Sequence, residues 1–129
     1  MDNDVLVQSM PFAAACGVQI ELATAEKVCG GLDWAPERCT IGGGLHGGVL
    51  MSLADSLGAV CAFLNLPPGA TTSTIESKSN FFRSAREGRV TATSIPLHVG
   101  RTTIVVQTDI RDHRGKALAL VTQTQIVLT

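Results

Sequence analysis

One segment, residues 47–64, constrains the fold more than any other part of the sequence. It holds eighteen residues, almost all of them small or apolar, and a single charge at Asp55. Two prolines and a glycine follow at 67–69, which predicts a helix that ends there. A helix this apolar needs partners on most of its surface. We therefore expect the rest of the chain to wrap around it.

The remaining segments predict mostly strands. Residues 3–15 predict a short helix interrupted by Pro11, and residues 35–44 a loop that ends in three glycines. Apolar, Thr-rich runs separated by turn residues predict strands, at 17–22, 27–34, 71–82, 89–99, 102–111 and 116–128. The first two should form a hairpin. The short turns after the helix predict a four-stranded antiparallel meander. The class is α+β, an antiparallel β-sheet wrapped around one long central helix.

The composition predicts one domain that associates with copies of itself. At 129 residues the chain has the size of a single domain, 1–129. Hydrophobic residues make up 45% and charged residues only 16%, against about 25% in typical soluble domains. Large exposed apolar patches are rare on monomers. We expect a homodimer, with a dimer of dimers as the larger assembly, and the choice between dimer and tetramer stays open.

Several functional classes are disfavoured. A net charge of −1 gives no basic footprint for nucleic acid. The longest apolar run, residues 49–66, is interrupted by polar residues, so no membrane span is expected. The first ten residues lack a cationic leader segment, and we expect a cytoplasmic protein. No metal-ligand or cofactor motif occurs, and we expect no metal, no cofactor and four free thiols at Cys16, Cys29, Cys39 and Cys61.

Asp55 is the first candidate for chemistry. At 100° per residue, one stripe of the helix should face the sheet, namely Leu50, Leu53, Leu57, Cys61 and Leu64. Asp55 lies about 160° from this stripe, beside Ser52, Ala59 and Ala62. A solvated face normally carries several charges, so this bland face predicts a second packed surface. A carboxylate there is costly unless it is hydrogen-bonded or used in a reaction.

The start of the helix is rich in glycine. Glycines at 42–44 and at Gly47 and Gly48 surround the first turn, where backbone N–H groups are free. Such groups, with the positive end of the helix dipole, can stabilise an oxyanion. His46 lies among them, and the sequence leaves open whether it caps the helix or takes part in catalysis.

These residues resemble a known signature. Leu45-His46-Gly47-Gly48 followed by Leu53-Ala54-Asp55 resembles the HGG…LAD pattern of hotdog-fold acyl-CoA thioesterases of the phenylacetate-degradation type. The resemblance covers residues 12–129, including the segments 74–81, 84–88 and 100–102 and the closing VTQTQIVL. It implies a hotdog fold and hydrolysis of an acyl-CoA or aryl-CoA thioester.

The resemblance also implies roles for individual residues. Asp55 would act as nucleophile or general base, and the Gly47 N–H would bind the thioester carbonyl. Thr74 would hold the attacking water or the acid. Thr40 departs from the pattern, because the family has Asn or Gln six residues before the histidine. The substrate-binding residues implied are Gly48 and, at the coenzyme A phosphates, Arg83 and Arg101.

Three questions stay open at this point. The acyl group is undefined, because the phenylalanines at 12, 63, 81 and 82 could line its pocket or belong to the core. A hydratase of the same fold is disfavoured, since its motifs are absent. A non-catalytic acyl-CoA-binding protein remains the alternative, and Thr40 is the feature that favours it. For an enzyme, Gly47 and Asp55 are eight residues apart, roughly 12 Å along one helix, which predicts an active site shared by two chains.

Overall fold

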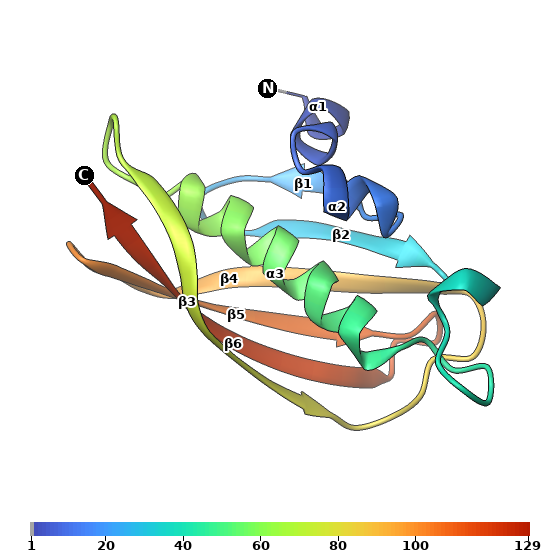
Figure 1. Cartoon of the computed structure of the whole chain (residues 1–129). Coiled ribbons are helices and arrows are strands. Elements are labelled where there is room, and N and C mark those ends of the chain that lie inside the picture. The colour runs from blue at the N-terminus through green and yellow to red at the C-terminus, as the bar shows by residue number, and fades with distance from the viewer. Residues whose placement is uncertain (1) are drawn as a thin grey trace.

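A computed structural model describes residues 2–129 (Figure 1). Figure 1 shows the long helix α3 (Gly47–Phe63) lying across one face of a six-stranded antiparallel sheet. The strands are β1 (Gln19–Ala23), β2 (Val28–Asp33), β3 (Thr71–Phe81), β4 (Arg89–Val99), β5 (Thr103–Arg111) and β6 (Ala117–Leu128). The predicted class and the hotdog arrangement of a sheet around one helix are confirmed.

The N-terminal segments agree with the predictions, with one addition. Two short helices, α1 (Asn3–Gln8) and α2 (Pro11–Ala15), replace a single helix, and Pro11 begins the second one. The side chain of Asp2 caps α1 by accepting from the Val5 N–H at 2.9 Å. β1 and β2 form the expected hairpin. The predicted loop before α3 also contains a 3-10 turn, Pro36–Arg38.

The position of β3 differs from the predicted meander. The order in the sheet is β1-β2-β4-β5-β6-β3, so only β4, β5 and β6 form a meander and β3 pairs with β6 at the edge. The connection from β3 to β4 holds the seven residues 82–88. Extended, seven residues reach more than 20 Å, whereas three strand spacings amount to about 14 Å. The connection is therefore long enough to cross the ends of β5 and β6.

A β-bulge divides β3. Relative to β6, Ile75 is an extra residue directly after Thr74. An extra residue exchanges the two faces of the strand from that point onward. Unbroken alternation would turn Glu76 and Lys78 toward α3 together with Thr74. Because of the bulge, the residues that face α3 beyond Ile75 are Ser77, Ser79 and Phe81.

The core lies between α3 and the sheet. The predicted apolar stripe is confirmed for Leu50, Leu53, Leu57 and Cys61, which are all buried, while Leu64 is half-buried beyond the last turn. Ala62 was expected beside Asp55 on the outer face, and that is wrong because its side chain is fully buried. The second half of α3 lines a cavity together with residues of α1 and the start of β3.

Several large apolar side chains are exposed on the outer surface of the single chain. None of the four phenylalanines belongs to the core, and their exposed fractions are 69% for Phe12, 55% for Phe63, 49% for Phe81 and 59% for Phe82. The alternative that they are core residues is therefore wrong. Within the described residues, every helix is too short or too polar to cross a membrane.

Cys61 provides a test of the packing beneath α3. Burial raises the pKa of its thiol from 9.0 to about 11, and the thiolate is the reactive form. In native protein at pH 8 we expect N-ethylmaleimide to modify the half-buried Cys29 and Cys39 long before Cys61, as read by peptide mass spectrometry. In urea, Cys61 should react at the rate of the others. Equal labelling of Cys61 in the native protein would contradict this packing.

The same shift predicts a dependence of stability on pH. Folding raises the pKa of Cys61, so its contribution to the free energy of unfolding is complete below pH 9 and is lost as the pH rises toward 11.

Candidate active site

The carboxylate of Asp55 is exposed in the single chain and is held by two hydrogen bonds. The Thr74 hydroxyl donates to Oδ1 at 2.7 Å, and the Gln123 amide Nε2 donates to the same oxygen at 3.0 Å. The sequence predicted a second packed surface around Asp55. Residues 2–129 of one chain do not form it, because the sheet covers only the opposite side of α3. Its hydrogen bonding, the other condition for a carboxylate on this face, is present.

A second buried amide orients the hydroxyl of Thr74. Thr74 is the last residue before Ile75, and bulges often re-aim a side chain beside a functional site. Gln125 Nε2 donates to the Thr74 hydroxyl oxygen at 2.6 Å. With that lone pair occupied, the hydroxyl proton goes to Asp55. Of the two alternatives for Thr74, the structure thus shows contact with the acid.

The start of α3 is capped by His46. Its Nδ1 accepts from the Gly48 N–H at 2.8 Å, so in the neutral ring the proton is on Nε2. A Cβ at Gly48 would lie 2.9 Å from this nitrogen, which explains the glycine. The Gly47 N–H makes no hydrogen bond within residues 2–129. The ring of Phe81 lies against Gly47, with Cζ 3.3 Å from where a Cβ would be.

Two cavities flank the first turns of α3. One of about 290 Å³ is lined by Asp55, Thr74, Ser77, Met51, Gly48 and Ser52. The other, about 410 Å³, includes His46, Arg38, Phe12 and Cys39, and it shares Gly48 and Ser52 with the first. The predicted residues Asp55, Thr74 and Gly48 are therefore brought together, and His46 lies across the helix start from them.

Thr40 is not brought to this cavity within one chain. It is exposed in a tight loop, where its N–H donates to the Gly44 carbonyl at 2.9 Å. An isolated antiparallel β-bridge between the backbones of Cys39 and Leu45 closes the loop. The Thr40 hydroxyl thus lies on the surface, on the side from which the chain enters α3.

The two predicted phosphate contacts lie at opposite ends of the sheet. Phe82 is hydrogen-bonded to Leu118, and Thr102 to Val127, so Arg83 and Arg101 are separated by about nine residues of β6, roughly 30 Å. One chain cannot bring both to the same phosphate. The β3–β4 connection that carries Arg83 is tied to the entry of α3 by the bond from Leu45 N–H to the Ala85 carbonyl, 2.8 Å.

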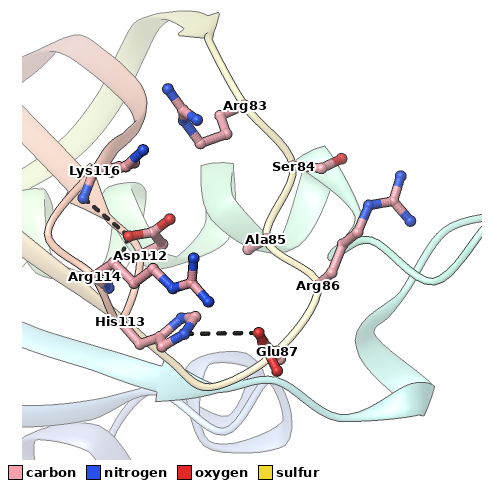
Figure 2. Close-up of a pocket in the computed structure, with 9 residues that line it drawn as sticks. All are labelled: Arg83, Ser84, Ala85, Arg86, Glu87, Asp112, His113, Arg114 and Lys116. Carbon is pink, nitrogen blue, oxygen red and sulfur yellow. Dashed lines mark hydrogen bonds and ion pairs between the residues drawn. The ribbon is translucent and has the colours of Figure 1, made fainter.

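Arg83 belongs to a polar cavity of about 200 Å³. Figure 2 shows Arg83, Arg114 and Lys116 gathered around Asp112, while Arg86 points away and donates to the Gly42 carbonyl at 2.7 Å. The backbone N–H of Lys116, with that of Arg114 and the charges of His113 and Arg83, lowers the pKa of Asp112. This carboxylate is therefore anionic, and it offsets part of the positive charge in the cavity.

Two other arginines of this half of the chain are engaged elsewhere. Arg89 forms ion pairs with Glu21 at 2.5 Å and with Asp33 at 3.5 Å, and Arg111 pairs with Asp109 at 3.0 Å. The pairs of Arg89 link β4 to β1 and β2, whereas Arg111 and Asp109 belong to the same strand, β5. Both arginines are therefore poor candidates for a ligand.

The sequence prediction missed Gln123. A signal was available, since alternation along VTQTQIVL places Gln123 and Gln125 on the same face as the buried Val121. Two buried glutamines on a core face indicate a hydrogen-bonding task, because buried amides are costly without partners.

A family profile described as the thioesterase superfamily matches residues 42–119, more than half of the chain. The matched span contains Gly47, Asp55 and Thr74 but not Thr40 or Gln123. Among curated relatives, 1,4-dihydroxy-2-naphthoyl-CoA hydrolase of Escherichia coli is 40% identical over 72 residues, which are 56% of this chain and 53% of that protein. The chain spans about half the length of the first such relatives.

Longer matches also occur. A candidate esterase of Bacillus subtilis is 32% identical over 108 residues, 82% of this chain and 85% of that protein. The crystal structure of a thioesterase from Haemophilus influenzae superposes with a TM-score of 0.93 and 27% identity, and covers 100% of this chain and 92% of that one.

The cap on α3 predicts a specific stability effect. Replacing His46 by Ala removes the acceptor for the Gly48 N–H, and loss of an N-cap costs about 1 kcal/mol. His46→Asn should retain most of that stability, since Asn is among the best N-cap residues. Urea unfolding at one fixed protein concentration measures both. Wild-type stability of His46→Ala, or equal losses in the two variants, would contradict the cap.

Proposed function

The chain belongs to the thioesterase superfamily, and from that premise we propose that it hydrolyses acyl-CoA or aryl-CoA thioesters to the free acid and coenzyme A. The observation that carries the proposal is the Asp55 carboxylate, fixed by Thr74 and Gln123 at an open cavity. The name of the E. coli relative, a hydrolase of an aromatic acyl-CoA, supports this substrate class.

The chemistry requires an attacking oxygen and a site for the negative charge that forms. Either Asp55 attacks the carbonyl carbon itself, or it accepts a proton from a water that attacks. The carbon–sulfur bond then breaks, the coenzyme A thiolate takes up a proton, and the acyl group leaves as the acid. If an acyl-Asp55 intermediate forms, water hydrolyses it in a second step.

Gly47 supplies the oxyanion donor in this proposal. Its N–H is the first of α3 and makes no hydrogen bond within the described chain. Donors at a helix start also carry the positive end of the dipole. The neighbouring Gly48 N–H is taken by His46, so Gly48 would act by leaving room for the thioester. His46 would act by shaping the turn.

The site needs two chains. Gly47 and Asp55 belong to the same helix and lie roughly 12 Å apart along its axis, whereas a reacting carbonyl must be about 3 Å from both groups. A two-fold axis that runs two α3 helices antiparallel brings Gly47 of one chain to Asp55 of its partner. The exposed apolar side chains around this face support such a dimer, with Met51, Ile75 and Phe81 more than 40% exposed.

The coenzyme A phosphates would meet Arg83. Its cavity contains Arg114 and Lys116 as well, and it adjoins the entry to α3. Arg101 would contribute only from another chain, since it lies at the far end of the sheet. The exposed apolar side chains of the single chain also support a dimer of dimers as the larger assembly.

A second candidate function is acyl-CoA binding without turnover. The observation that favours it is Thr40, which carries a hydroxyl where the resembled family has an amide. A panel of short, long and aromatic acyl-CoA thioesters, scored by thiol release and by calorimetric binding, separates the two. Binding without release on every thioester would select the second candidate.

Asp55→Asn tests the proposed role most simply. The amide is nearly isosteric but cannot attack or accept a proton, and general base catalysis is worth about 10²- to 10⁴-fold. We expect turnover of the best thioester in the panel to fall at least about 10²-fold, with an unchanged melting temperature. Full activity in folded Asp55→Asn protein would exclude Asp55 as the reacting group.

A further inference from the structure

Two glutamines lie in the core of this chain beneath the candidate site. Gln123 and Gln125 are both fully buried on β6, facing α3. Each amide donates toward Asp55, Gln123 directly and Gln125 through the Thr74 hydroxyl. A buried amide in an apolar core is costly unless it is hydrogen-bonded, so the tasks of these two side chains need an explanation.

The stability of the fold does not explain Gln123. Its carbonyl oxygen Oε1 is buried and has no hydrogen-bond partner within residues 2–129. An unsatisfied buried acceptor destabilises a protein, and an apolar side chain of similar shape would avoid that cost. What Gln123 contributes is the single N–H that reaches Asp55.

Gly58 makes this contact possible. It follows Asp55 by three residues, so it lies nearly on the same side of α3, and its own backbone is buried. A Cβ built at Gly58 would overlap the Gln123 amide group. The glycine therefore provides the space in which this amide lies against the helix.

Both donors act on one oxygen of Asp55. Thr74 at 2.7 Å and Gln123 at 3.0 Å contact Oδ1, and Oδ2 receives no hydrogen bond from the residues described. Two donors from β3 and β6 define the plane of a carboxylate that otherwise stands exposed on the helix. Oδ1 is therefore held in place by hydrogen bonds, whereas Oδ2 is left open to a ligand.

We infer that Gln123 is a positioning residue for Asp55: it holds Oδ1 in place beside Thr74 so that Oδ2 faces the thioester or its attacking water. This role requires glycine at position 58, because a side chain there would occupy the space of the Gln123 amide. The inference rests on the proposed function, since it assigns a task to the same carboxylate. It holds whether Oδ2 attacks the carbonyl or accepts a proton from water.

The test is Gln123→Met, which keeps the volume and removes the donor. We expect kcat on an acyl-CoA thioester to fall about 10- to 100-fold, as when groups that orient a metal ligand are removed. KM should change little. The melting temperature should stay or rise, since an unsatisfied acceptor disappears.

Gly58→Ala is an independent route to the same effect. It leaves Gln123 chemically intact, displaces its amide and favours the helix, so its kcat should also fall while KM changes little. It also decides the question if Gln123→Met fails to fold. Thr108→Val is the matched control, since Thr108 is fully buried on β5 and its hydroxyl, among residues 2–129, is bonded only to that of Ser94, at 2.6 Å. It should lower the melting temperature and leave kcat unchanged.

The outcomes separate this inference from the proposed function. If Asp55→Asn is inactive while Gln123→Met and Gly58→Ala keep the wild-type kcat, Gln123 is not a positioning residue. A lower melting temperature of Gln123→Met with unchanged kinetics would likewise overturn the inference. If Asp55→Asn itself is active, the failure belongs to the proposed role of Asp55.

Discussion

Helix α3 packs Leu53, Leu57 and Cys61 against one face of the sheet, and this contact determines what its other face can do. The sheet covers only one side of the helix, so Asp55 remains exposed on the opposite side. An isolated carboxylate on an exposed, apolar helix face would be mobile. Here β3 and β6 reach around the helix at its edge, and their side chains hold the carboxylate from the side. The packing that stabilises the fold thus also places the candidate reacting group.

Two features of the single chain support the proposed dimer. Its apolar surface is large, with all four phenylalanines about half exposed or more. Its candidate oxyanion donor and its candidate acid lie on one rigid helix, too far apart to act together. A partner chain related by a two-fold axis would cover the apolar surface, and it would bring its own oxyanion donor to the acid of the first chain. Neither the cavity at Asp55 nor the one at His46 is closed by the residues of one chain.

Local patterns predicted most of the fold, and long-range pairing was harder. The apolar stripe of α3, the break at Pro11 and the strand limits follow from periodicity and turn residues. The place of β3 beside β6 does not, because a seven-residue connection allows several neighbours. The bulge at Ile75 leaves no signal in the alternation of TIESKSNF, yet it decides which side chains face Asp55. At the candidate site, Asp55 was predicted from its place on the helix and from the HGG…LAD pattern, and Thr74 from the resemblance of the following strand. Gln123 was not singled out, and its contact with Asp55 is apparent only from the structure.

Subunit complementation tests the shared site most directly. Asp55→Ala removes the acid, and Gly47→Pro removes the oxyanion donor at the first helical position, which tolerates proline. His46 already has the extended backbone that a following proline requires. Each parent should be inactive. After subunit exchange, verified by native mass spectrometry, half of the dimers are mixed and each has one intact site, so about a quarter of wild-type activity should return. A mixture that exchanges subunits and stays inactive would contradict an active site built from two chains.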